Sequence, residues 1–374
     1  MKPVFKSNGY IEQFTLGEGD LRFAVKDTLD VAGHRTRAGS PALANAPVAQ
    51  RHAEVVARLL EAQCVLTGKT TLHELAFGVT GINPRCGTPL NPHYPTLIPG
   101  GSSSGSAAVV ASGEVDFSLG TDTGGSVRMP AACCGIIGLK PGFGVLSRSG
   151  VMPEQSSLDC VGVFARDADV LRKVMTRLAV PVGPPLEAFP SLAYVLAAEP
   201  DIDACIDEFL SQAGVTPQEA ALPLLEEAHR AGLTLISHEN WLASGPLLKS
   251  NLVSPDVASR IRAGADISEE ALRHAEQIRR AFTEQVDDLL NITPLLAMAT
   301  LPELPPTLRE AEEPLSVVNL TRLVRPFNLS GHPAITLPVG EIDGRPVALQ
   351  LIARRGDDGL LVQAAGWLNA RRRH

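Results

Sequence analysis

Short apolar runs and helical patterns alternate along the first zone of the chain, residues 1–178. Residues 21–25 (LRFAV) predict a short strand, and residues 54–61 (EVVARLLE) have the spacing of an amphipathic helix. Small residues at 106–113 predict another helix, and a strand is expected at 115–119. Strands that alternate with helices in this way indicate an α/β fold, in which helices cover both faces of a central sheet.

Two further zones follow. Residues 179–315 are rich in proline at first and then helical, whereas residues 316–374 return to strand-like runs at 334–339 and 347–352. No internal repeat is visible. The sequence therefore predicts one domain spanning residues 1–374, with a core formed by 21–178 and 316–374 and with a helical segment that lines the substrate site.

The clearest helix of the middle zone covers residues 267–290. Asp266 precedes it and Glu269 follows three residues later, which is the spacing of a capping box. Four apolar residues fall near one face and are expected to pack against the core: Ala271, Ile278, Phe282 and Val286.

Composition narrows the function. The 374 residues are 44% apolar and 20% charged, so a sizeable core is assured, and the net charge of −8 argues against nucleic acid as a partner. Six cysteines without a C-x-x-C pair predict small buried side chains in a reducing compartment. An apolar leader and a run of roughly 18 apolar residues are both missing, so the sequence predicts a cytoplasmic protein without a membrane partner.

Two loops rich in glycine and serine carry the candidate chemistry, residues 99–106 (PGGSSSGS) and 120–128 (GTDTGGSVR). About one helix and one strand separate them, so their ends can meet at one edge of the sheet. Gly124 and Gly125 permit tight backbone conformations in which successive N–H groups converge to form an oxyanion hole. Ser126 follows directly and is the candidate nucleophile. A single GGS segment is typical of a flexible turn; the pair of loops favours catalysis.

A base is available upstream. Lys26 follows an apolar strand, where burial would lower its pKa toward neutrality, although a lone lysine at such a position is more often solvated. Nine histidines show no metal-ligand spacing, so no metal is expected. Residues 68–70 (GKT) look like the end of a phosphate-binding loop, but Gln63 stands where that motif needs glycine. No cofactor is expected either.

On these motifs the chain resembles the amidase signature family. The resemblance runs from about residue 21 to 170 and resumes at 327–352, and 24 residues separate Ser102 from Ser126, as in that family. It implies the amidase signature fold, a central twisted mixed sheet covered by helices on both faces. The short amino terminus is similar to that of the plant indole-3-acetamide hydrolases.

The resemblance also implies residue roles. Ser126 corresponds to the nucleophile, Ser102 to a relay serine that follows a cis peptide, and Lys26 to the base. The backbone N–H groups of four residues correspond to the oxyanion hole: Thr123, Gly124, Gly125 and Ser126. Three further residues are expected to support the loops and the helix that follows them: Ser103, Asp122 and Arg128.

The expected reaction is hydrolysis of a small primary amide to a carboxylic acid and ammonia through an acyl-enzyme on Ser126. Apolar stretches at 240–243 and 245–248 favour an uncharged or aromatic acyl group. Three alternatives remain open: an amidase acting on a urea- or biuret-type compound, a glutaminase subunit of an amidotransferase, and an inactive docking module with this fold. Whether the chain forms a homodimer is also left open.

Overall fold

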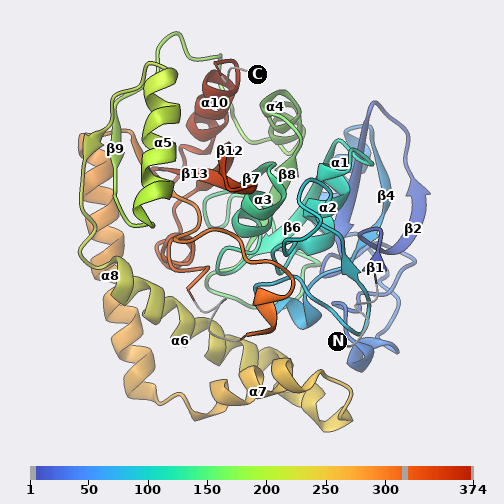
Figure 1. Cartoon of the computed structure of the whole chain (residues 1–374). Coiled ribbons are helices and arrows are strands. Elements are labelled where there is room, and N and C mark those ends of the chain that lie inside the picture. The colour runs from blue at the N-terminus through green and yellow to red at the C-terminus, as the bar shows by residue number, and fades with distance from the viewer. Residues whose placement is uncertain (1–5, 314–318, 372–374) are drawn as a thin grey trace.

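A computed structural model of the chain describes residues 6–313 and 319–371 (Figure 1). The remaining residues, 1–5, 314–318 and 372–374, lie outside this description, and they include the predicted start of the second core segment at 316.

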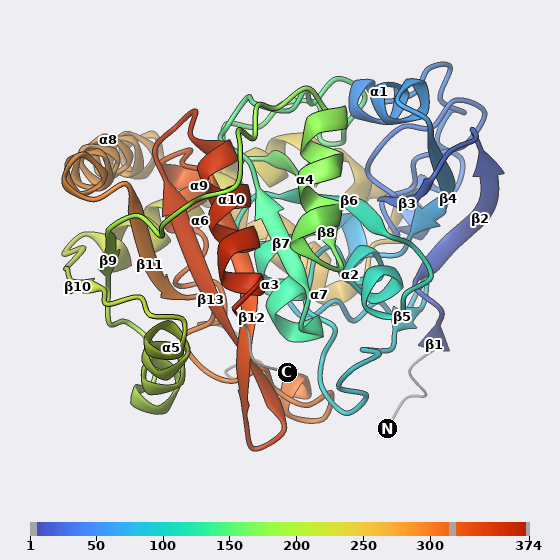
Figure 2. The same ribbon diagram turned by 90° about the horizontal axis from the view of Figure 1, so that it is seen from above.

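One large mixed sheet organises the molecule (Figure 2). Its eleven strands follow the order β10 (Gln218–Glu219), β9 (Leu192–Tyr194), β11 (Leu295–Ala299), β13 (Arg345–Ala353), β12 (Ala334–Ile342), β7 (Ile137–Lys140), β8 (Cys160–Ala165), β6 (Phe117–Asp122), β3 (Leu21–Lys26), β4 (Cys64–Thr70) and β2 (Tyr10–Leu16). Both parallel and antiparallel pairs occur, which confirms the predicted mixed sheet. A separate two-stranded pair joins β1 (Lys6–Ser7) to β5 (Thr88–Pro89).

Helices cover both faces of this sheet, as predicted. The described helices are α1 (Glu54–Glu61), α2 (Ser104–Ala111), α3 (Arg128–Cys134), α4 (Ala168–Arg177), α5 (Pro200–Gln212), α6 (Leu225–Ser244), α7 (Pro255–Ala263), α8 (Glu269–Ile292), α9 (Pro326–Leu329) and α10 (Asp358–Asn369). Alternate residues of one strand enter different clusters: Phe23 packs with α1 and α4, whereas Ala24 packs with α2 and α3. None of the helices in the described ranges is long and apolar enough to cross a membrane.

The predicted boundaries hold best in the first and last zones. The strand expected at 115–119 begins two residues later and runs to Asp122. Its start is delayed because the Val115 N–H donates to the carbonyl of Val109, which keeps Val115 in the turn after α2. The Asp116 carboxylate in turn accepts the Arg22 N–H at 2.8 Å, so the strand starts only after this contact.

The middle zone differs from the prediction of a helical segment. It supplies α5 to α8, which Figure 1 shows along one side of the molecule, but also strands β9 and β11 of the main sheet. The expected cap of α8 is wrong: Ser268, not Asp266, accepts the Ala271 N–H at 3.1 Å. Asp266 ends a short 3-10 turn instead.

The apolar stripe of α8 faces the core as expected. Its buried residues are Ala275, Phe282, Val286 and Leu290, whereas Ala271 and Ile278 are half-buried. Packing explains this stripe, because Phe282 stacks at a tilt against Phe327 of α9 with 6.1 Å between ring centroids.

The direction of two strands positions the candidate site. β3 and β6 are parallel neighbours, with Val25 paired to Leu119. Parallel strands end at the same edge of a sheet, so Lys26 at the end of β3 and Asp122 at the end of β6 lie on one edge. The small residues of α2 allow close packing on β6, where the Ser118 hydroxyl donates to the Ser106 carbonyl at 2.7 Å.

Candidate active site

Lys26 is fully buried at this edge and has no carboxylate as a direct partner among the described residues. Its Nζ donates to Ser102 Oγ at 2.8 Å and to Thr121 Oγ1 at 2.8 Å. Burial lowers the pKa of Lys26 to about 7, although the more distant charges of Asp159 and Asp122 oppose the shift. A large share of the lysine is therefore uncharged near neutral pH, as a general base must be.

The first loop presents Ser102 to this lysine. The Gly101–Ser102 peptide is cis, and the Ser102 carbonyl accepts the His73 N–H at 3.0 Å. The next residue joins the two loops, because the Ser103 N–H donates to the Ser126 carbonyl at 3.3 Å. The predicted meeting of the loops at one edge is thus observed.

The second loop needs glycine at Gly125. Its φ of +113° lies in a region that residues with a Cβ rarely adopt, and a Cβ there would lie 2.2 Å from Val324 Cγ2. This tight turn places Ser126 between the end of β6 and the start of α3. Ser126 and Gly124 are only half-buried, so solvent reaches the loop.

Asp122 holds the second loop in shape. Its carboxylate accepts the N–H groups of Gly125 at 2.8 Å and Val127 at 3.1 Å, and it forms an ion pair with Arg128 at 2.8 Å. Burial by itself would raise the pKa of Asp122, but the guanidinium of Arg128 and the amide of Asn328 hold it well below its usual range. The carboxylate therefore stays charged and keeps its acceptors available to the loop.

Arg128 connects the loop to the far part of the chain. The side chain is fully buried, and its Nη1 donates to the Val324 carbonyl at 2.7 Å and to Gln350 Oε1 at 2.8 Å. Its Nη2 also donates to Asn328 Oδ1 at 2.6 Å. Arg128 thus braces more than the helix that follows it: it ties β6 to β13 and α9.

The expected oxyanion donors divide into two groups. The Gly125 N–H is directed to Asp122, so it is engaged within the loop. The N–H groups of Thr123, Gly124 and Ser126 form no hydrogen bond with any residue in the described ranges. Unengaged N–H groups on a solvent-reached loop are suited to stabilise a negatively charged oxygen.

Sequence reasoning missed two groups that position this site. Thr121 is the second acceptor for Lys26, and it lies within the glycine-rich motif that was recognised. Asp159 accepts the Thr123 hydroxyl at 2.8 Å and the Arg148 Nε at 3.1 Å, but no motif surrounds it in the sequence. Only the structure brings Asp159 to this edge.

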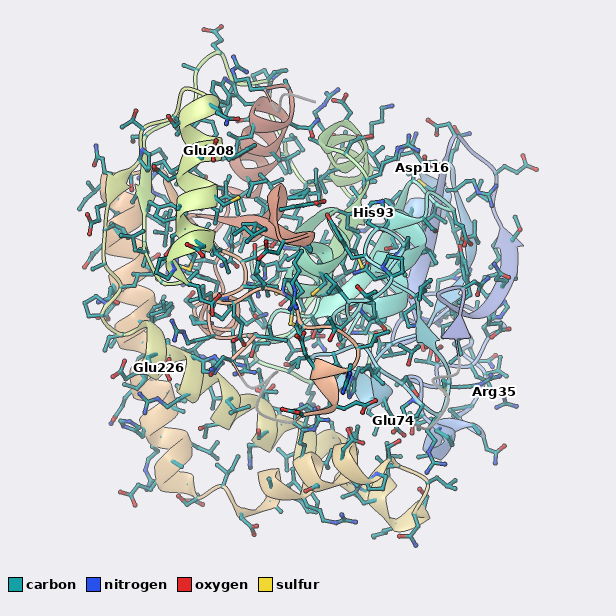
Figure 3. All side chains as sticks on the ribbon, viewed as in Figure 1. Arg35, Glu74, His93, Asp116, Glu208 and Glu226 are labelled. Atoms are coloured by element: carbon teal, nitrogen blue, oxygen red, sulfur yellow. The ribbon has the colours of Figure 1, made fainter. Side chains whose placement is uncertain are left out.

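Neighbouring loops are fixed by a buried glutamate. Glu74, labelled in Figure 3, accepts the Ser40 hydroxyl at 2.6 Å and the Ser254 N–H at 3.0 Å. Ser254 directly precedes α7, so Glu74 links that helix to the segment whose His73 N–H contacts the Ser102 carbonyl.

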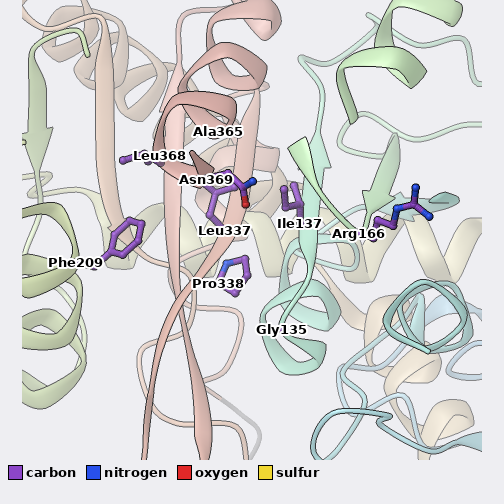
Figure 4. A pocket seen from close by; sticks show the side chains of 9 residues that line it. All are labelled: Gly135, Ile137, Arg166, Phe209, Leu337, Pro338, Ala365, Leu368 and Asn369. Carbon is purple, nitrogen blue, oxygen red and sulfur yellow. The ribbon is translucent and has the colours of Figure 1, made fainter. Parts of the chain in front are cut away.

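A small cavity of about 60 Å³ lies elsewhere on the molecule (Figure 4). Its lining includes Gly135 at the carboxyl end of α3, whereas Ser126 precedes the amino end of that helix. Within the described ranges, no group of three or more histidine, cysteine or acidic side chains is arranged to hold a metal ion. The two catalytic-type loops therefore remain the candidate site.

Comparison with known proteins agrees with this placement. The family description Amidase matches residues 21–182 and 204–362. The chain is 34% identical over 392 residues to Amidase 1 of Oryza sativa subsp. japonica, covering 91% of this chain and 88% of that protein. It is 30% identical over 429 residues to a glutamyl-tRNA(Gln) amidotransferase subunit of Natronomonas pharaonis, covering 97% and 99%. A crystal structure of an amidase superposes with a TM-score of 0.85 at 31% identity, covering 94% of this chain and 85% of the other. The chain belongs to the amidase family and is a hydrolase that acts on carbon–nitrogen amide bonds.

Proposed function

We propose that the chain hydrolyses a small primary amide to a carboxylic acid and ammonia, with Ser126 as nucleophile, Ser102 as proton relay and Lys26 as base. The observation that carries this proposal is the 2.8 Å hydrogen bond from the buried Lys26 Nζ to Ser102 Oγ, beside the loop that holds Ser126. A lysine with a pKa near 7 and a serine hydroxyl as acceptor supports proton transfer at neutral pH.

The reaction proceeds in two halves. Ser126 Oγ attacks the amide carbonyl while its proton passes to Ser102 and the Ser102 proton passes to neutral Lys26. The N–H groups of Thr123 and Gly124, together with that of Ser126, stabilise the resulting oxyanion. The proton returns through Ser102 to the leaving nitrogen, and ammonia departs. Water then attacks the acyl-enzyme by the same proton path and releases the carboxylic acid.

Labelling tests the assignment of the nucleophile. A sulfonyl fluoride or fluorophosphonate is expected to modify Ser126 and to abolish ammonia release from a panel of amides. Ser126→Ala removes only a hydroxyl from a half-buried position, so this variant should fold normally and be inactive. Modification of Ser102 instead, with Ser126 unlabelled, would refute the roles proposed for the two serines.

A second candidate is a glutaminase subunit of an amidotransferase. The similarity to an amidotransferase subunit over nearly the whole of both chains favours it. This candidate predicts slow ammonia release by the purified chain and strong activation when a partner protein is added. Full activity of the chain alone toward a non-glutamine amide would exclude it.

We also propose that the whole chain is one amidase domain acting in the cytoplasm as a homodimer. The support is the single sheet shared by all three zones, and six unpaired cysteines, four of which are buried as small apolar side chains. Light scattering of the purified chain and fractionation of the source cells are the corresponding tests.

A further inference from the structure

Arg325, the residue before α9, is a buried cation without a counter-ion. Its side chain is 8% exposed, and its Nη1 lies 3.1 Å from the ring nitrogens of His229. Its Nε is buried and has no hydrogen-bond partner. No aspartate or glutamate forms an ion pair with it in the ranges that the structure describes, and residues 314–318 contain no acidic side chain.

This cation lies against the proposed oxyanion loop. A Cβ added at Gly124 would lie 3.2 Å from Arg325 Nε and 3.1 Å from Ile236 Cδ1. On the other side, a Cβ added at Gly232 of α6 would lie 2.9 Å from Arg325 Cγ. Two glycines thus leave the room in which the arginine side chain passes between α6 and the loop. Because Gly124 is half-buried, solvent reaches the loop at the point of this contact.

Charge makes the arrangement unfavourable without a ligand. Burial lowers the pKa of Arg325 to about 10, so the guanidinium remains protonated at neutral pH. Burial also lowers the pKa of His229 to about 3, so the imidazole is neutral and supplies a hydrogen-bond acceptor without a negative charge. A buried charge is costly unless it is paired, and a planar guanidinium is matched best by a carboxylate.

We propose that Arg325 binds a carboxylate on the acyl part of the substrate, so that the enzyme prefers half-amides of short dicarboxylic acids. The inference rests on the proposed amide hydrolysis at Ser126 and names the substrate class of that same site. It replaces the expectation of an uncharged acyl group. That expectation relied on residues 240–248, where Trp241 packs against Gly245 and Leu242 is 65% exposed.

The first experiment measures binding without turnover. Calorimetry on Ser126→Ala compares the half-amides of malonic, succinic and glutaric acid with propanamide, butanamide and pentanamide, which have matched chain lengths. At least one half-amide is expected to bind more tightly than its neutral counterpart, by about 10- to 100-fold, the range of hydrogen bonds to charged groups. Adding Arg325→Gln should remove this preference. Arg325→Lys keeps the charge but loses the planar fork, so it should retain part of it.

The matched control is Arg230→Gln, which removes the same charge from an exposed position of α6 where the arginine pairs with Glu226. It should leave the preference unchanged. Equal binding of half-amides and neutral amides, or a preference that survives Arg325→Gln in a folded variant, would overturn the inference.

Turnover separates this inference from the proposed function. With Ser126 intact, the ratio of kcat/KM for a half-amide over its neutral partner should fall about 10- to 100-fold in Arg325→Gln, mainly through KM. Hydrolysis of neutral amides without any preference would refute the carboxylate while leaving the hydrolase intact. Arg325-dependent binding of half-amides without hydrolysis of any amide would instead refute the roles of Ser126, Ser102 and Lys26.

Discussion

Two buried arginines meet the catalytic loops from different sides, and their surroundings differ. Arg128 has a carboxylate, Asp122, and neutral acceptors on Val324, Gln350 and Asn328. Arg325 has one neutral histidine and a buried Nε without a partner. Both belong to a polar layer between the sheet and the helices, yet only one of them is fully satisfied.

The difference separates a structural role from a ligand-binding role. Where buried polar groups satisfy one another, as Asp122 and Arg128 do, the loop is fixed before substrate arrives. Where a buried donor lacks an acceptor, the free protein is less favourable than the complex, and binding of a matching group supplies the missing contact. Substitutions on the two sides should therefore change different measurable quantities.

The largest effect is expected on the satisfied side, at the base. Lys26→Met should lower kcat/KM by about 10²–10⁴-fold, the usual contribution of general base catalysis, because nothing else accepts the proton from Ser102. In the wild-type enzyme, kcat/KM should fall as the pH decreases through about 7, since protonated Lys26 cannot act as a base. A pH–rate profile from pH 5 to 9 measures this limb.

Stability gives an independent readout of the same lysine. The folded-state pKa is lowered, so the native protein binds fewer protons than the unfolded chain between about pH 7 and the ordinary lysine value. The free energy of unfolding should therefore rise with pH across that window, and Lys26→Met should remove this rise. An unchanged acid limb of activity in the variant would assign the base to another residue.

The second effect concerns Arg128. Arg128→Met should lower the free energy of unfolding by about 3–5 kcal/mol, because it leaves the Asp122 carboxylate buried without its counter-ion. Urea unfolding followed by circular dichroism measures the change. Asp122→Asn combined with Arg128→Met should recover part of the loss, whereas additive losses would mean that the two side chains do not act as a pair.

The satisfied side was also the side that sequence reasoning could reach. Lys26, Ser102 and Ser126 lie in continuous motifs, and parallel strand ends bring such motifs together without knowledge of the remaining fold. The partners of Arg128 were out of reach, since Gln350 lies 222 residues away and an isolated glutamine in a strand has no pattern.

The other side depends on contacts that no local pattern encodes. Arg325 and His229 are 96 residues apart, and Gly232 is an ordinary residue of a helix until Arg325 is seen to pass it. The short strands β9 and β11 were missed because apolar runs of three and five residues between helices have no distinctive period. Ser268 and Asp266 are both suitable caps, and only the backbone path decides between them.

A third prediction tests the unsatisfied side through stability. Arg325→Met should change the free energy of unfolding of the ligand-free protein by no more than about 1 kcal/mol, since it removes a buried charge that has no counter-ion. A saturating half-amide should then raise the melting temperature of Ser126→Ala but not that of the Ser126→Ala and Arg325→Met double variant. A loss as large as that of Arg128→Met would show that Arg325 is structural.

The smallest effect is expected where the two sides touch, at Gly124. Gly124→Ala places a methyl group 3.1 Å from Ile236 Cδ1 and 3.2 Å from Arg325 Nε, so both side chains must move by a few tenths of an ångström. Such overpacking should cost about 1 kcal/mol of stability. Displacement of the guanidinium should also lower the preference for half-amides more than it lowers the hydrolysis of neutral amides. The control is Gly366→Ala in α10, where a Cβ meets nothing within 4 Å, and where alanine should stabilise the helix by about 1 kcal/mol. If Gly124→Ala reduced hydrolysis of both amide classes equally, the loop and Arg325 would not be coupled through this contact.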